Sequence, residues 1–267
     1  MNLLYRSGLG PQRFAARLRE HADAVTMMRL AREAFAATRS GSRARWLWRP
    51  CDDDVLEAAG RVARLAVAMP GRYLIEAITD PGRKPALIAC NGERLWRAYP
   101  DRVAVRAAQP PPMGIAAILD PAWLLDDGHQ VSVAGKAVVD GRPALHVRAA
   151  GDWLPPHSAP LSGTPVLCDQ AEVFIDQALG ICLRQVNSYH GHPVLRTELT
   201  GLTATVDQAM FDYEPPPGMT VITGGLLAEA GQTPAGVAWQ IATGLAGLAL
   251  EIGRRWPNRS DHAEPDP

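Results

Sequence analysis

The chain has no excess of charge of either sign. Its 27 Lys and Arg residues nearly balance its 28 Asp and Glu residues, and the formal net charge is -1. Long-range attraction of nucleic acid or of an anionic membrane needs a strong basic excess. The composition therefore predicts no nucleic-acid partner and no global field toward a membrane.

Cysteine is scarce and is not arranged as a metal site. The sequence contains four cysteines at wide spacings, with no CxxC pair: Cys51, Cys90, Cys168 and Cys182. This spacing argues against a zinc knuckle and against a thioredoxin-type redox motif. We interpret the cysteines as buried thiols, with disulfides as the less favoured alternative.

Recognisable catalytic motifs are also missing. The sequence has no GxSxG, no glycine-rich phosphate loop and no HExxH. The two histidines of residues 190–193, HGHP, are more typical of a hairpin tip than of a metal site. The aspartates 52–54 fit the acidic first turn of a helix, and residues 126–129, DDGH, fit a turn. We therefore predict a non-enzymatic protein that holds no metal and no cofactor.

A secretory leader is not visible at the amino terminus. Residues 1–21 lack the uninterrupted apolar stretch and the small-residue cleavage site of a signal peptide. On this basis we expect a cytoplasmic protein, with its carboxy-terminal region as a potential membrane contact.

What the chain does contain is enough apolar residues for a sizeable core. Hydrophobic residues make up 47% of its 267 residues, which excludes disorder for most of the length. Apolar residues at spacings of three and four predict an amphipathic helix over residues 11–38 and a second helix over residues 55–69. Between them, residues 43–49 alternate arginine with aromatic or aliphatic residues and favour a strand.

The middle of the sequence alternates short apolar runs with turn signals, which predicts an antiparallel sheet. Asn91-Gly92 and Asp140-Gly141 each stand between two such runs, and both predict hairpins with type I′ turns. A short helix is expected near residues 115–125, and residues 152–164 are expected to form a loop. The expected strands are residues 73–79, 86–90, 94–99, 103–106, 130–139, 144–149, 171–176, 181–189 and 194–204.

The carboxy-terminal region forms a separate unit. Residues 230–250 carry no charge, but their glycines, glutamines and threonines reduce the hydrophobic gain of a membrane span. An amphipathic helix that packs on the body or lies at a membrane surface is therefore favoured over a span. We expect two parts, a β-rich domain over 1–224 and a helix with a polar tail over 225–267. A membrane surface or a protein partner would bind through 230–256.

One segment resembles a known fold family. Residues 171–222 contain a strand ending in Asp176, a Leu-Gly turn at 179–180, Glu198 on a later strand, and an aromatic pair before Pro-Pro-Gly at 216–218. This order resembles the carboxy-terminal half of the lipoprotein carrier LolA and of the regulatory domain of the sigma-E regulator RseB. The segments 71–73 and 91–96 fit the early hairpins of that family. The chain is thus similar to the LolA/RseB-like fold family, as a divergent actinobacterial-type member, over about residues 14–222.

The resemblance implies both a fold and a ligand class. Proteins of that family have an α+β fold, a strongly bent antiparallel sheet or incomplete β-barrel with helices covering its concave face. Here a C-terminal helix would be added. The cavity between sheet and helices takes up acyl chains or lipids, so we expect an apolar small molecule or lipid as ligand. The candidate lining is Trp46, Trp48, Leu74, Trp96, Leu119, Trp123, Phe174 and Leu183.

Two functions remain open at this point. The favoured one is non-enzymatic binding of a lipid or other apolar ligand, driven by removal of apolar surface from water at roughly 25 cal/mol per Å². The alternative is a regulatory interaction module that docks on a membrane or a signalling partner, as the RseB resemblance implies. Equally, the aromatic residues of the candidate lining could simply fill a core.

Overall fold

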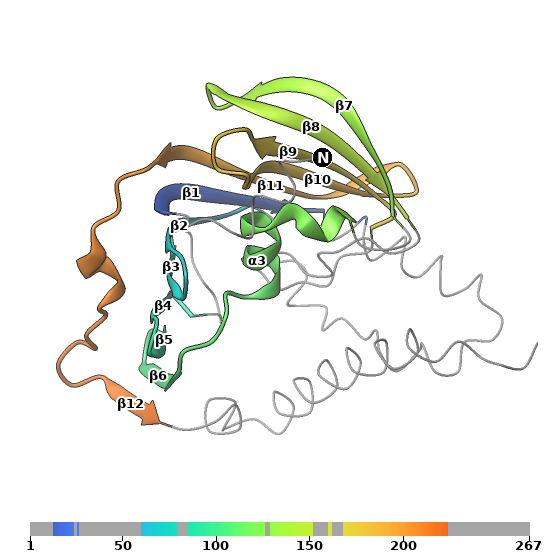
Figure 1. Ribbon diagram of the computed structural model, residues 1–267. Coiled ribbons are helices and arrows are strands. Elements are labelled where there is room, and N and C mark those ends of the chain that lie inside the picture. The colour runs from blue at the N-terminus through green and yellow to red at the C-terminus, as the bar shows by residue number, and fades with distance from the viewer. Residues whose placement is uncertain are drawn as a thin grey trace, which may run out of the picture.

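The described part of the protein is one large open sheet, mostly antiparallel, with little helix (Figure 1). The computed structural model describes residues 13–23, 26, 60–78, 85–125, 129–151, 160–161 and 168–223. Its 12 strands are β1 (Arg13–Ala22), β2 (Arg61–Ala68), β3 (Arg72–Ala77), β4 (Leu87–Asn91), β5 (Arg94–Ala98), β6 (Arg102–Ala107), β7 (Gln130–Val139), β8 (Arg142–Ala150), β9 (Gln170–Asp176), β10 (Cys182–Tyr189), β11 (His192–Thr203) and β12 (Thr220–Thr223). The described helical elements are α3 (Met113–Leu119), η2 (Pro121–Leu125) and η3 (Gln208–Phe211).

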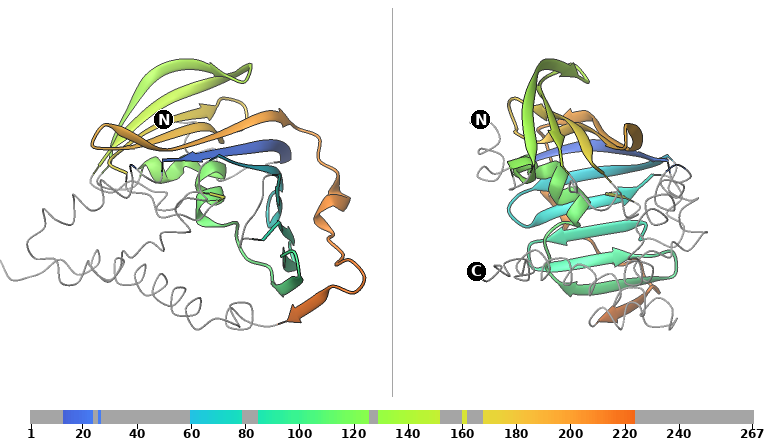
Figure 2. Two further views of the ribbon diagram at one scale, coloured as in Figure 1. Left: turned by 180° about the vertical axis from the view of Figure 1, so that it is seen from behind. Right: turned by 90° about the vertical axis from the view of Figure 1, so that its right-hand side faces the viewer.

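The sheet consists of two arms that meet at its first strand. Its order is β12-β6-β5-β4-β3-β2-β1-β11-β10-β9-β8-β7. β1 pairs with β2 on one side and with β11 on the other, both antiparallel. The arm β2–β6 descends from β1, whereas β7–β11 form the arm above it, so the sheet is sharply bent (Figures 1 and 2). β12 adds to the edge strand β6 in parallel.

The helix predicted over residues 11–38 is wrong for its first half, which is strand β1. Along β1 the side chains of Phe14, Leu18 and Ala22 are buried, while Arg17 and His21 are exposed. Residues four apart share a face in a helix and also in a strand, so this spacing fits both structures. Pairing with β2 and β11 decides for the strand.

The helix predicted over residues 55–69 is also wrong where the structure describes it. Residues 61–68 form β2, and its second half is buried on both faces. A strand covered on both sides loses the polar alternation by which strands are recognised. The uninterrupted apolar run of residues 65–69 therefore fits a helix as well as a strand.

The predicted hairpins are confirmed, although one of them turns differently. Asp140 and Gly141 have φ of 50° and 74°, as a type I′ turn requires. β4 and β5 also form a hairpin at Asn91-Gly92, but only the glycine has positive φ there. Instead, the Oδ1 atom of Asn91 accepts hydrogen bonds from the backbone amides of Glu93 and Arg94.

Several sequence predictions fall on parts of the chain that the structure does not describe. These are the strand at 43–49, most of the loop at 152–164, and the carboxy-terminal unit 225–267 with its helix. The expected short helix near 115–125 is present as α3 followed by η2.

Candidate functional site

The inner side of the bend carries the larger of two apolar clusters. α3 lies in the angle between the two arms (Figures 1 and 2). Ile115, Ile118 and Leu119 of this helix and Leu124 of η2 pack with buried side chains from both arms. We call the strand side of this cluster the concave wall. Its members include Phe14, Leu18, Leu65, Tyr73, Leu95, Val147, Val173, Ile175, Leu183, Leu195 and Leu199.

A second cluster lies on the outer face of the lower arm. There Leu74, Trp96 and Val103 pack with Val206 and Phe211. The segment after β11 supplies these last two residues as it runs down the outer side of the sheet to β12 (Figure 1). The lower arm is therefore covered on both faces.

The structure divides the predicted cavity lining between these faces. Leu119, Trp123 and Leu183 belong to the concave wall or border it. Leu74 and Trp96 do not, because they are in the outer cluster. Alternation explains this, since Tyr73 and Leu95, the neighbours of Leu74 and Trp96, face inward.

Phe174, a further predicted lining residue, is not on the wall either. Phe174 borders the inner cluster, but its ring stacks on His146 with centroids 4.4 Å apart, and the guanidinium of Arg184 lies over it. Because His146 and Arg184 are its partners in the sheet register, Phe174 belongs to the outer face. Trp46 and Trp48 lie outside the described residues.

A row of buried polar side chains interrupts the apolar wall. Arg61 on β2 stands opposite Glu20 on β1, Glu20 opposite Thr197 on β11, and Thr197 opposite Gln185 on β10. These four side chains and Asn187, which follows on the same face of β10, are each at most 8% exposed. We call them the polar row. The backbone amide of Leu161 donates a hydrogen bond of 2.5 Å to Glu20 Oε2, so this segment lies across the row.

Asn187 of the polar row has an unused hydrogen-bond donor. The Nε2 atom of Gln185 donates to Oδ1 of Asn187 at 2.6 Å. Asn187 is 0% exposed, yet its Nδ2 has no hydrogen-bond partner. A buried amide without a partner costs roughly 1–3 kcal/mol, and such groups are rare in cores that serve packing alone.

Sequence reasoning missed the polar row because the signal depends on the structure of residues 13–22. In a strand, Phe14, Ala16, Leu18 and Ala22 fall on one face, and Glu20 is the single polar side chain among them. Read as a helix, the same glutamate belongs to a polar face with the arginines and attracts no attention.

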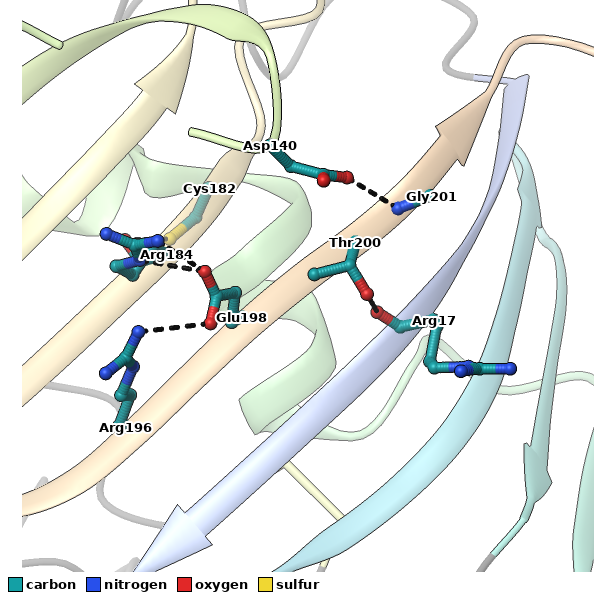
Figure 3. A network of polar contacts seen from close by, with 8 residues as sticks. All are labelled: Arg17, Asp140, Cys182, Arg184, Arg196, Glu198, Thr200 and Gly201. Carbon is teal, nitrogen blue, oxygen red and sulfur yellow. Dashed lines mark hydrogen bonds and ion pairs between the residues drawn. The ribbon is translucent and has the colours of Figure 1, made fainter. Parts of the chain in front are cut away.

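The opposite face of the upper arm is polar and rich in arginine. Arg184 and Arg196 converge on Glu198, with nitrogen–oxygen distances of 2.5 and 3.2 Å (Figure 3). Further along the arm, Arg148 pairs with Glu172 at 3.0 Å. Arg17 on β1 points away from the Glu198 cluster (Figure 3).

A groove of about 460 Å³ lies at one end of the strands β7–β10, and its character differs from the predicted apolar cavity. Ser132, Arg148 and Glu172, which are register partners on the outer face, line it together with other polar residues. Its polar lining gives an acyl chain little apolar surface to cover.

The buried ion pair of the upper arm anchors a turn. Asp176 is 1% exposed and accepts from Nε of Arg142 at 2.5 Å and from the amides of Ala178 and Leu179 at 2.9 and 2.8 Å. Burial alone would raise the pKa of Asp176, but these hydrogen bonds outweigh it and hold the pKa below its usual value. The carboxylate therefore fixes the turn between β9 and β10.

The described cysteines agree with the interpretation as buried thiols. Cys90, Cys168 and Cys182 are free and buried. Burial raises the pKa of Cys168 and that of Cys182 to about 12. Neither thiol is poised as a nucleophile, which needs a thiolate near neutral pH.

Within the described ranges, no group of three or more His, Cys, Asp or Glu side chains is placed to hold a metal ion. No described helix has the length and apolar character that a membrane crossing requires.

Comparisons with known proteins gave structural matches of low TM-score and low sequence identity. No protein-family model and no curated protein matches it. An uncharacterized conserved protein from Thermus thermophilus has a TM-score of 0.44 at 10% identity, over 84% of this chain and 96% of that chain. The MucA/MucB complex structure of Pseudomonas aeruginosa has a TM-score of 0.43 at 12% identity, over 84% of this chain and 62% of that chain.

A LolA superfamily protein from Nitrosomonas europaea has a TM-score of 0.28 at 9% identity, over 79% of this chain and 96% of that chain. The ligand has to be inferred from the residues of this chain.

Proposed function

We propose that the protein binds an amphiphilic lipid on its concave wall without catalysing a reaction. The apolar part of the ligand would pack against the leucines and valines of the wall, where its binding is driven by the loss of apolar surface from water. Its polar end would reach the polar row. Apolar pockets with a few convergent polar groups are the usual form of small-molecule sites.

The observation that carries this proposal is the unpaired amide of Asn187. A core that only stabilises the fold gains nothing from a buried donor without an acceptor, and it would be more stable with an aliphatic residue there. A ligand oxygen, such as the carbonyl of an acyl ester, would accept from Nδ2 and recover this cost. Since Glu20 and Arg61 stand opposite each other, the row offers no net charge, which favours an uncharged polar end.

The described helix α3 is too short to cover the whole concave wall. α3 has seven residues and is therefore about 10 Å long. The wall extends from β5 across β1 to β8, which at strand spacings of about 4.8 Å is roughly 38 Å along the bent sheet. We propose that a lipid enters between the sheet and the cover formed by α3 and η2.

The experiment compares added bulk on the two faces. Leu183→Trp adds bulk to the concave wall, and Leu74→Trp adds the same bulk to the outer cluster. Both leucines are at most 5% exposed, so both changes cost a similar roughly 1–3 kcal/mol in overpacking. Lipid retained through purification is counted by native mass spectrometry, and affinity for a pyrene-labelled monoacylglycerol is measured by fluorescence.

We expect Leu183→Trp to lose bound lipid and at least ten-fold in affinity, while Leu74→Trp binds as the parent protein does. If the parent protein neither retains lipid nor takes up the probe, the proposal fails. It also fails if both variants bind equally well, because the ligand would then lie elsewhere.

A further inference from the structure

The outer face opposite the concave wall concentrates arginine on adjacent strands. Arg17 and Arg19 of β1 are exposed. Arg64 of β2 and Arg196 of β11 have side chains that are 59% and 53% exposed. Together with Arg184 of β10, these residues form what we call the arginine face. It covers four neighbouring strands, β10, β11, β1 and β2, because all five are linked by register pairs or by alternation along one strand.

The carboxylates on this face are already used. Glu198 is 18% exposed and pairs with both Arg184 and Arg196, and Glu76 of β3 pairs with Arg64 at 3.1 Å. Arg19 stands opposite Glu198 in the register, but it forms no ion pair with it. The arginine face therefore keeps a local positive charge in a chain whose overall charge is nearly zero.

Arg17 and Arg19 have no ion-pair partner in the part of the chain that the structure describes. Arg17 stands directly opposite Arg64 in the pairing of β1 with β2. Like charges at directly opposed positions of an antiparallel pair destabilise it. The described part of the fold gains no stability from this arrangement, and an anion bound at the face would relieve the repulsion.

We propose that the arginine face docks on the surface of an anionic phospholipid membrane. Guanidinium groups bind phosphate oxygens in pairs, and each arginine near such a surface contributes a roughly five-fold gain in binding. The field of the face decays within about 8 Å at physiological ionic strength, so it acts on contact and not at long range. This docking is independent of lipid binding on the concave wall.

The layout of the face favours a membrane over other polyanions. Its cations spread in two dimensions over four strands, roughly 14 Å across at the usual strand spacing. A nucleic-acid backbone is instead bound by a positively charged groove that follows the strand. Phe174, the aromatic ring beside Arg184, is stacked on His146 and offers no free face to a base. The residues between the arginines are Thr200 and Val62, which give a protein partner little apolar contact.

The test is sedimentation of the full chain with phosphatidylcholine vesicles, with and without phosphatidylglycerol, at several salt concentrations. The variant Arg17→Gln/Arg19→Gln removes both unpaired arginines. Arg94→Gln/Lys136→Gln is the matched control, because it changes the net charge equally at exposed positions away from the arginine face. Circular dichroism confirms that both variants are folded.

We expect salt-sensitive binding to the anionic vesicles only, a roughly 25-fold loss in the first variant, and a change below two-fold in the control. Equal binding to neutral vesicles would overturn the proposal, since the contact would then be apolar. Equal losses in both variants, or none in either, would also overturn it. So would tighter binding of poly-glutamate or of an oligonucleotide than of vesicles through Arg17 and Arg19.

Discussion

Replacing the two amides of the polar row by apolar side chains should separate stability from binding. Gln185 and Asn187 are 2% and 0% exposed, and their one mutual hydrogen bond is 2.6 Å long. The variant Gln185→Met/Asn187→Leu keeps the volumes similar and removes both polar groups. It also removes the unpaired Nδ2 of Asn187, whose burial costs roughly 1–3 kcal/mol.

The expected free energy of unfolding of this double variant is equal to that of the parent or higher by up to about 2 kcal/mol. Each single variant leaves the other amide without its partner and should lose about 1–2 kcal/mol. The difference between the double variant and the two single ones is the coupling of the pair. Urea denaturation followed by tryptophan fluorescence measures all four proteins.

Binding should change in the opposite direction. If Asn187 Nδ2 donates to a ligand oxygen, the double variant loses affinity for the monoacylglycerol probe by roughly ten-fold or more, since a hydrogen bond in a dry site is lost. Affinity for a pyrene-labelled alkane, which has no acceptor, should stay the same. A double variant that loses more than about 2 kcal/mol of stability and binds both probes as before would refute the reasoning. The polar row would then serve the fold.

Three other expectations follow from the geometry. Asp176→Asn breaks a buried ion pair and should cost about 3 kcal/mol of stability. Because folding lowers the pKa of Asp176, the parent protein loses this stability as the pH falls through the folded-state pKa, and the variant without the carboxylate loses less. Urea midpoints measured between neutral and acidic pH would show this difference. Cys168 and Cys182, with pKa values of about 12, should resist a thiol reagent at pH near 8 until the protein is unfolded, and fast labelling of either in the native protein would contradict their burial. Gly141→Ala forces a side chain onto a residue with φ of 74°, which should cost about 1 kcal/mol in thermal or urea unfolding, and an unchanged stability would mean that the β7–β8 turn has another conformation.

The sequence was informative where a strand has one wet face and ends in a turn. Asp140-Gly141 between β7 and β8 and the HGHP segment between β10 and β11 were identified as hairpin tips, because positive φ at two successive positions restricts the residue types. Sequence reasoning failed at β1 and β2, which lie in the middle of the sheet. Leu65 and Ala66 point to opposite faces and are both buried, so the hydrophobic pattern does not show the alternation that identifies a strand.

Burial on both faces also made the lining of the candidate site hard to predict. Of the predicted lining residues, the structure brings Leu183 and Leu119 together in the inner cluster, whereas Leu74 and Trp96 belong to the outer cluster. In this sheet both faces of the lower arm are apolar, and only the cover on each side tells them apart. The resemblance to the LolA/RseB fold family supplied the bent sheet, and it carried no information about the side chains of the polar row.

The position of β1 in the middle of the sheet has a consequence for synthesis. The hydroxyl of Thr200 reaches the backbone oxygen of Arg17 across 183 residues of sequence. At translation rates of about 5–20 residues per second, β1 waits roughly 10 to 40 s for its second neighbour to leave the ribosome. During that time the lower arm ends in an open strand, and the upper arm has nothing to attach to. The second edge of β1 is therefore paired only late in synthesis. A ribosome that stalls before β11 releases a chain in which this edge of β1 is unpaired.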